Sequence, residues 1–162
     1  MPSLQAPTAR LHTAFLEAHD EWGPGLHEDG FGLTLDDDVR TAAGFAAWVS
    51  RLTRAEDPAN GADQSTLRWI VDDDRVLGGI ALRHTLDEAL GHIGFGVRPS
   101  ARRRGLATWA LTEMLGEARA HGLHRVLIVC ATDNVASART ALRCGAVPEP
   151  TEGPTRRYWI TL

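Results

Sequence analysis

The stretch GFGVRPSARRRGLATWAL, residues 94–111, organises the chain around one strand, one loop and one helix. Apolar residues that alternate with glycines favour a β-strand at its start, and apolar residues at helical spacing favour a helix at its end. Between them lie Arg102, Arg103 and Arg104, followed directly by Gly105. Unpaired backbone N–H groups at a helix N-terminus favour an anion, and glycine lets the backbone approach it closely. We expect a phosphate or pyrophosphate at this loop.

The arginine run is a local feature of an acidic chain. The sequence holds 17 Lys and Arg against 21 Asp and Glu, a formal net charge of -4, and its isoelectric point is about 5.9. Nucleic-acid affinity comes mainly from a basic field that neutralises phosphates, and this composition does not supply one. Nucleic acid is therefore not an expected partner.

The 162 residues are enough for one domain, so we expect a single domain over residues 1–162. The longest apolar run, VLIVCA at residues 126–131, is far shorter than the roughly 20 residues of a membrane span. The N-terminus lacks a secretion signal pattern, which predicts a cytoplasmic protein without a membrane partner. Cys130 and Cys144 lack the spacing of a zinc site, so we expect reduced thiols and no metal.

The first half of the chain predicts two helices. TARLHTAFLEAHDEW, residues 8–22, carries apolar residues at helical spacing and ends before a Gly-Pro-Gly stretch. A second helix is expected to open at Asp36, Asp37 and Asp38, whose charge suits the positive end of a helix dipole. Its expected apolar face consists of Val39, Ala43, Ala46 and Ala47, then Val49 or Leu52. Residues 54–65 are expected to form a loop.

The second half predicts mainly strands. Residues 66–84 favour a hairpin with Asp72, Asp73 and Asp74 in its turn, and residues 91–97 favour a further strand. A helix is expected from 105 to 121, a buried strand over 125–130, a short helix over 134–144 and a last strand over 156–162. The unit of strand, helix and strand predicts a crossover with parallel strands. The fold class is therefore α/β (α+β), with a mixed central β-sheet flanked by about four helices.

The loop fits one known phosphate pattern and not others. It lacks the Gly-Lys-Ser/Thr ending of a Walker loop and the glycine spacing of a dinucleotide fold. Arg102, Gly105 and Ala107 instead match Arg/Gln-x-x-Gly-x-Gly/Ala. With this pattern the chain resembles the GNAT family of acyl-CoA-dependent N-acetyltransferases. The resemblance continues at residues 130–146, where Asn134, Ser137 and Gly145 match a second family motif, and a subgroup of uncharacterised predicted acetyltransferases is similar over about residues 12–160.

This resemblance implies acetyl-CoA as cosubstrate and gives several residues roles. Backbone groups of β-strand residues would pair with the pantetheine arm, namely Phe95, Gly96 and Val97. The Val97 N–H would also polarise the thioester carbonyl. The pyrophosphate would be surrounded by Arg102, Arg103, Arg104, Gly105, Leu106 and Ala107. Asn134 would hydrogen-bond the pantetheine region, at the start of the helix motif that contains Ser137.

The chain departs from the family pattern at the catalytic groups. Many relatives carry a tyrosine that protonates the departing thiolate at the position of Ala141. Tyr158 or a water molecule is the expected substitute, although a tyrosine on a last strand is also a common sheet residue. His92 is the candidate general base because histidine titrates near neutral pH, with a purely structural role as its alternative. The other candidate bases are His84, Asp87 and Glu88.

The sequence therefore predicts an acetyl-CoA-dependent N-acetyltransferase whose acceptor is a primary amine of a small molecule or peptide. The amine would attack the thioester directly, and acylation of Cys130 is the alternative route. The protein is expected to be a monomer or a homodimer. A non-catalytic acyl-CoA-binding or sensing module is the alternative function. Residues 27–32 and 55–63 are acidic, and they predict either a negative cleft for a cationic amine or ordinary solvated loops.

Overall fold

The computed structural model describes residues 1–27 and 30–162. Its strands are β1 (Ser3–Gln5), β2 (Ser65–Asp72), β3 (Arg75–Asp87), β4 (Gly91–Val97), β5 (Arg125–Ala131), β6 (Val147–Glu149) and β7 (Thr155–Thr161). Its α-helices are α1 (His12–Trp22), α2 (Ala42–Arg54), α3 (Leu106–Ala120) and α4 (Val135–Arg143), and short 3-10 helices cover Ala9–Leu11, Pro58–Asp63 and Pro99–Ala101. All the helices and strands expected from the sequence are present, and β1 and β6 are short strands in addition to them.

The strands form one sheet in the order β1-β2-β3-β4-β5-β7-β6, which is an α/β arrangement with helices packed on a sheet. The expected parallel pairing of residues 91–97 with 125–130 is not observed. Within the described chain these strands share a single register pair, Gly91 with Ile128, and it is antiparallel. Beyond that pair, no further register pair joins the described residues of β4 and β5. The helical crossover between these strands therefore does not lead to a parallel ladder. The mixed sheet expected from the sequence is thus antiparallel in every register pair described.

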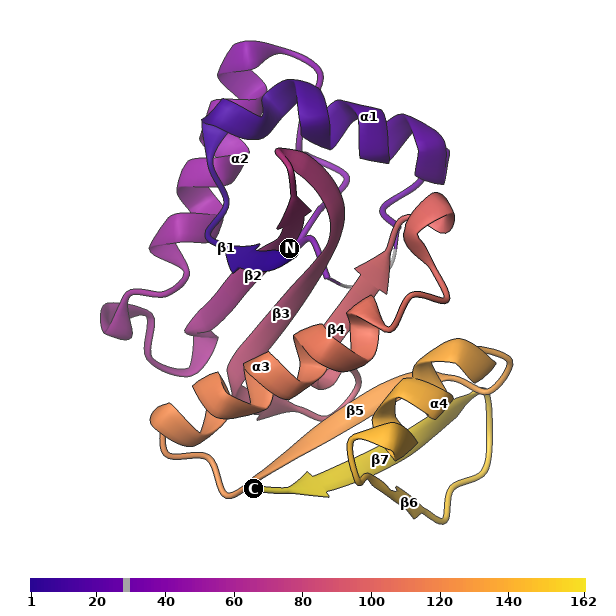
Figure 1. The fold of residues 1–162 in the computed structure, drawn as a ribbon. Coiled ribbons are helices and arrows are strands. Elements are labelled where there is room, and N and C mark those ends of the chain that lie inside the picture. The colour runs from indigo at the N-terminus through magenta and orange to yellow at the C-terminus, as the bar shows by residue number, and fades with distance from the viewer. Residues whose placement is uncertain (28–29) are drawn as a thin grey trace.

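Helices cover the two faces of the sheet separately (Figure 1). Helices α1 and α2 pack on one face in a core rich in aromatic residues, which includes Phe15, Phe45, Trp48 and Trp69. Helices α3 and α4 pack on the other face, and in Figure 1 α3 crosses β3 and β4 while α4 lies over β5 and β7. We call these the α1/α2 face and the α3/α4 face.

Two local predictions are confirmed in detail. The apolar stripe predicted for the crossover helix is buried in α3, at Leu106, Ala110, Met114, Leu115 and Ala118. The turn between β2 and β3 holds Asp73 and Asp74 with φ of 47° and 59°, a left-handed conformation that short polar residues tolerate. The sequence pattern therefore predicts correctly the buried face of a helix of several turns and the turn of a hairpin.

The start of the second helix was predicted wrongly. Helix α2 begins at Ala42, because the Thr41 hydroxyl caps it by accepting the Gly44 N–H at 3.0 Å. The aspartates 36–38 precede the helix, and Asp38 accepts a hydrogen bond from the Thr41 hydroxyl. The buried face consequently holds Phe45, Trp48, Val49 and Leu52, while Ala43, Ala46 and Ala47 are exposed.

None of the helices in residues 1–27 and 30–162 is both long enough and apolar enough to span a membrane.

Phe15 is the centre of the aromatic core on the α1/α2 face. Its ring centroid lies 4.8 Å from that of Trp48 and 5.5 Å from that of Phe45, and its side chain is 1% exposed. We expect Phe15→Ala to lower the free energy of unfolding by about 3–5 kcal/mol, because it removes a large buried ring and leaves a cavity. Urea unfolding followed by tryptophan fluorescence measures the change. Leu35→Ala, at a position that is 90% exposed, is the control, and a loss below about 1 kcal/mol for Phe15→Ala would contradict this packing account.

Candidate functional site

The gap between β4 and β5 forms the first pocket. It has a volume of ≈ 180 Å³ and opens where the two strands stop pairing. Residues of β4, β5 and the start of α4 line it, among them Gly94, Phe95, Cys130, Asn134 and Ser137. The structure therefore brings predicted residues from two distant motifs to one place. We call this the splay pocket.

Asn134 begins α4 at the mouth of the splay pocket. Its side-chain carbonyl accepts the backbone N–H of Ser137 at 3.2 Å, which is an N-cap contact. This bond uses only the amide oxygen, and the NH₂ group of an asparagine side chain is a separate double donor. Asn134 can therefore cap its helix and donate to a ligand in the pocket at the same time.

The arginine loop ends directly at the N-terminus of α3. Gly105 is the N-cap residue with φ of 76°, and it has no side chain with which to cap the first N–H groups of the helix. Arg103 also adopts a positive φ of 62°, and Arg103, Arg104 and Gly105 are exposed. Leu106 is buried and Ala107 half-buried behind the loop. An uncapped helix N-terminus with backbone N–H groups turned outward is suited to an anion.

Arg102 is exposed like its neighbours, but its side chain also contacts the rest of the fold. Its Nε donates to the Val97 carbonyl at 2.8 Å, and its guanidinium lies 5.8 Å from the centroid of the Trp22 ring. The side chain thus ties the loop back to the end of β4 and to α1. Arg102 therefore helps to shape the loop that carries Arg103 and Arg104.

Arg98, at the end of β4, holds the loop on α1. It is 3% exposed, and its Nε donates to the Glu21 carboxylate at 2.5 Å. The same carboxylate accepts the backbone N–H of Ser100 at 2.6 Å, and Arg98 also donates to the Val76 carbonyl. Burial acts to raise the pKa of Glu21, but the hydrogen bonds from Ser100 and Arg98 outweigh it and keep the pKa below its ordinary value. This ion pair, in which only the arginine is buried, fixes where the loop lies.

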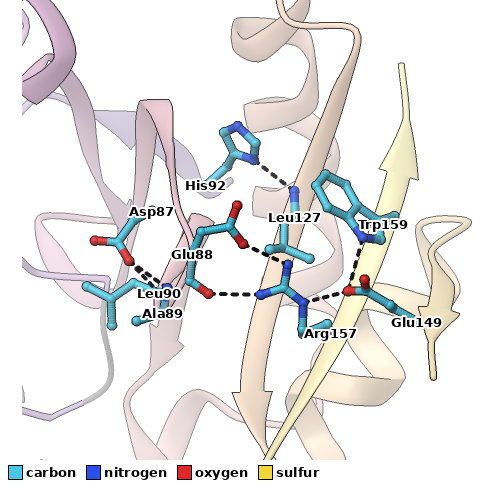
Figure 2. Close-up of polar contacts among 9 residues, drawn as sticks. All are labelled: Asp87, Glu88, Ala89, Leu90, His92, Leu127, Glu149, Arg157 and Trp159. Carbon is cyan, nitrogen blue, oxygen red and sulfur yellow. Dashed lines mark hydrogen bonds and ion pairs between the residues drawn. The ribbon is translucent and has the colours of Figure 1, made fainter. Parts of the chain in front are cut away.

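His92 lies at the closed end of the gap. It is 5% exposed, and its Nδ1 accepts the backbone N–H of Leu127 from β5 at 2.9 Å (Figure 2). Burial lowers the pKa of His92 below 6.5, and the charges of Arg125 and Arg83 lower it further. The imidazole is therefore neutral at neutral pH, with its proton on Nε2 while the Leu127 bond is made.

The other candidate bases have partners of their own. Asp87 accepts the N–H groups of Ala89 and Leu90 in the turn after β3, and those bonds lower its pKa. His84 hydrogen-bonds the Thr66 hydroxyl at 2.8 Å and packs against His121, just after α3, with ring centroids 4.0 Å apart. His84 thus belongs to the α3/α4 face.

Arg157 connects the turn after β3 to the C-terminal strands (Figure 2). It donates to the backbone carbonyl and the carboxylate of Glu88, at 2.8 and 3.1 Å, and it is ion-paired with Glu149. Glu149 also accepts the Trp159 indole N–H at 3.4 Å. These contacts bridge β5 from one side to the other, so they hold together the parts of the sheet that β4 and β5 barely join.

Tyr158 and Ala141 lie in the same core on the α3/α4 face. Ala141 is fully buried on α4, Tyr158 is 9% exposed on β7, and α4 packs against β7. The Tyr158 phenol therefore lies on the same side of the sheet as Ala141, the position at which the family resemblance led us to look for a tyrosine. Cys130 lines the splay pocket, and burial raises the pKa of its thiol. Neither cysteine forms a disulfide.

On the α1/α2 face the chain after α1 lies directly on the sheet. A Cβ atom at Gly30 would come within 2.1 Å of the Gly79 carbonyl oxygen, and one at Gly79 within 2.7 Å of the Gly30 oxygen. Only two glycines permit this approach of backbone to strand. It places residues 30–33 beside β3, where a second pocket of ≈ 140 Å³ opens between α2, β2 and β3.

The acidic cleft expected from residues 27–32 and 55–63 is not what lines this second pocket, whose charged residues are Arg51 and Arg83. Glu56 is ion-paired with Arg68, and Asp57 caps the 3-10 helix that follows it. Glu28 and Asp29 lie outside the described residues. Among the residues described, no group of three or more His, Cys, Asp or Glu side chains is placed to hold a metal.

A family profile for an acetyltransferase (GNAT) domain matches residues 34–147 of this chain. The chain belongs to the GNAT acetyltransferase family. The match spans both motifs that carried the resemblance, the arginine loop and the helix that begins at Asn134. It makes the protein an acyltransferase of the N-acetyltransferase type.

Solved structures share the fold of this GNAT chain. A microcin C7 self-immunity acetyltransferase, MccE, in complex with acetyl-CoA and AMP is 17% identical with a TM-score of 0.68, over 99% of this chain and 92% of that one. RimJ of Mycobacterium smegmatis in complex with CoA-disulfide is 20% identical with a TM-score of 0.70, over 99% and 81%. The ribosomal L7/L12 alpha-N-protein acetyltransferase RimL is 15% identical with a TM-score of 0.68, over 99% and 90%. Curated protein sequences yield no match.

The GNAT motifs led to residues that line the splay pocket and missed the ion pair that holds the arginine loop on α1. Phe95, Asn134 and Ser137 do share one pocket, as expected. Arg98 and Glu21 were not singled out, because they lie 77 residues apart and nothing local marks either as buried. The only sequence signal for this ion pair was Arg98 itself, between Val97 and Pro99, and it does not reveal that Glu21 is its partner.

The lowered pKa of Glu21 predicts a pH-dependent contribution to stability. A carboxylate whose folded pKa is depressed stabilises the fold above its unfolded pKa, near 4.5, and loses that contribution as pH falls through the folded pKa. Glu21→Gln should therefore destabilise the protein at neutral pH, with a difference from the parent that shrinks below pH 4.5. Urea unfolding across this range measures it, with the exposed Glu113→Gln as control. A difference of constant size at every pH would contradict the ionic account.

Proposed function

We propose that the chain transfers the acetyl group of acetyl-CoA to a primary amine by direct attack of the amine on the bound thioester. The observation that carries this is the splay pocket, a gap in the sheet with Asn134 and Ser137 at its mouth, beside an uncapped helix N-terminus with an arginine loop. Family membership supports acyl transfer, and a relative solved with acetyl-CoA supports that cosubstrate.

The cosubstrate would be bound mainly by backbone groups. The edge of β4 beyond Gly91 has no ladder with β5, so its N–H and C=O groups suit the amides of pantetheine, at Phe95, Gly96 and Val97. The pyrophosphate would lie at the N-terminus of α3, within the loop of Arg102, Arg103, Arg104, Gly105, Leu106 and Ala107. Asn134 would donate its NH₂ group to the pantetheine arm, next to Ser137.

The transfer step needs a neutral amine, an oxyanion donor and a proton for the thiolate. The amine nitrogen attacks the thioester carbon, a C–N bond forms, and the carbonyl oxygen becomes an oxyanion for the Val97 N–H to stabilise. As the carbonyl re-forms, the C–S bond breaks and releases CoA thiolate, which takes a proton from Tyr158 or water. The amide nitrogen loses one proton in the same step, and that proton restores the donor, so the products are the acetylated amine and the CoA thiol. The raised pKa of Cys130 leaves little thiolate, which favours direct transfer over acylation of that residue.

The competing function is an acyl-CoA-binding or sensing module without turnover. Ala141 in place of a tyrosine favours it, and so does the engagement of His92 Nδ1 by a backbone N–H. Both functions require CoA binding, and they differ only in acceptor-dependent release of the CoA thiol. A solved relative named as an alpha-N-protein acetyltransferase supports turnover on an amine.

Acetyl-CoA binding should depend on Gly105. A Cβ there meets no protein atom within 4 Å, so a Gly105→Glu side chain has room but brings bulk and negative charge to the proposed pyrophosphate site. We expect this variant to lose acetyl-CoA binding in calorimetry and thiol release from acetyl-CoA in a screen of amines, amino acids and peptides.

Gly122→Glu is the matched control for this variant. Gly122 follows the other end of α3, also has a positive φ, of 81°, and also has open space for a Cβ. Both variants therefore carry the same backbone strain, of about 1–3 kcal/mol. Unchanged acetyl-CoA affinity in folded Gly105→Glu would refute the anion site, and binding without acceptor-dependent thiol release in the parent protein would favour the binding module.

The base role of His92 is a prediction that its lowered pKa makes specific. Nδ1 is the unprotonated nitrogen of the neutral ring, so acting as a base requires Nδ1 to release the Leu127 N–H. A base must be neutral, so activity should be full above pH 6.5 and fall as pH drops through the lowered pKa. His92→Ala should remove this acidic limb and reduce kcat by about 10²-fold, with little change in the KM for acetyl-CoA.

Steady-state kinetics against pH, with the exposed His124→Ala as control, separate this role from a structural one. If His92→Ala keeps the pH profile and instead raises the KM for acetyl-CoA, the residue only joins β4 to β5 through Leu127. Glu88, Asp87 or His84 would then be tested as the base.

A further inference from the structure

The second pocket has the composition of an anion site. We call it the arginine pocket, and its lining includes Arg51 from α2, Arg83 and Ala81 from β3, and Ser65, Leu67 and Leu52. The two arginines come from different elements and line one pocket together with apolar side chains. A guanidinium matches a carboxylate or phosphate with two parallel N–H donors, and a hydroxyl adds a further donor.

Arg51 is already held in place. Its Nη2 donates to the Gly32 carbonyl at 3.0 Å and to the Asp37 carboxylate at 2.5 Å, and the Asp37 side chain is 11% exposed. These contacts use one nitrogen of the group, and a guanidinium carries five N–H donors on three nitrogens. The ion pair with Asp37 therefore orients Arg51 without using the donors on Nε and Nη1.

The arginine pocket lies one strand away from the splay pocket. Ala81 lines the arginine pocket and is the register partner of Gly94, which lines the splay pocket. Paired residues of neighbouring strands point to the same face, and the strands are about 4.8 Å apart. The charge of Arg83 is felt at His92, whose pKa it lowers after burial and Arg125. Gly94 has no side chain to separate the two pockets on this face.

We propose that the acceptor is an amine with an anionic group, a carboxylate or a phosphate, which binds in the arginine pocket while the amine reaches the thioester beside Gly94. This inference rests on the proposed function and names its substrate class. The separation by one strand predicts several bonds between the amine and the anion. Two arginines disfavour polyamines and other purely cationic acceptors, because like charges repel at this distance.

The test compares acceptors that differ in charge and little in shape. Thiol release from acetyl-CoA is measured with γ-aminobutyrate, aminopropyl phosphate, the neutral amide of γ-aminobutyrate, and putrescine. We expect kcat/KM to be about tenfold to hundredfold higher for an anionic acceptor than for the amide, the range of a charge-assisted hydrogen bond. The larger of the carboxylate and phosphate values identifies which anion the site takes.

Variants assign the preference to the pocket. Arg51→Gln and Arg83→Gln should each reduce the ratio of acid to amide at least about tenfold while acetyl-CoA affinity in calorimetry is unchanged. Arg54→Gln, on the exposed side of α2, is the matched control and should leave the ratio unchanged. Two separate arginines keep the test decisive if one variant does not fold.

The outcomes distinguish this inference from the function on which it rests. Equal turnover of acid and amide, or a preference that survives both arginine variants, overturns the anionic acceptor and leaves acetyl transfer standing. If no acceptor releases thiol, binding decides: aminopropyl phosphate and γ-aminobutyrate are titrated against the CoA-bound protein in a thermal-shift assay. A shift lost in Arg51→Gln supports the pocket, and no shift overturns it.

Discussion

The splay pocket exists because β4 and β5 share a single register pair in the described chain, Gly91 with Ile128. Each other neighbouring pair of strands has three or more register pairs. Backbone N–H and C=O groups that face such a gap must be satisfied by water or a ligand. Acetyl-CoA, the cosubstrate proposed above, would complete the sheet there through the amides of its arm. The bond from Leu127 to His92 joins β4 and β5 at the end of the gap where the two strands still pair.

A sheet opened in this way must be held together from outside, and charged groups do this on both sides. Arg157 bridges the turn after β3 to β6 and β7 through Glu88 and Glu149, across the weakly joined strands. Arg98 joins the end of β4 to α1 through Glu21. Arg98 is buried, so losing its partner would leave a desolvated charge, which is far more costly than losing an exposed pair. Arg98 thus fixes the β4 side of the gap to α1, and Arg157 links the two sides of the gap to each other.

The sequence predicted best what depends on neighbours along the chain. The apolar period of α3, the hairpin turn at Asp73 and the loop motif are all local, and all are present. What failed depended on distant partners. Parallel pairing of β4 and β5 is the usual outcome of a crossover, but here the strands share one antiparallel register pair and then separate. His92 lies on the strand over residues 91–97, as expected, yet its bond to Leu127 follows from an approach of β5 that no local pattern encodes.

The distribution of charge likewise depends on which distant residues the fold brings together. The chain carries a net charge of -4, and the segments around the acceptor side are acidic in sequence. In the fold, however, Glu56 is paired with Arg68 and Asp57 caps a helical turn, so these carboxylates serve the backbone and the surface. Arg51 and Arg83, which are isolated arginines in the sequence, line one pocket because α2 packs on β2, the neighbour of β3 in the sheet. The field in a pocket depends on the charges within a few ångströms, so this packing gives the arginine pocket two guanidinium groups that the net charge of the chain does not predict.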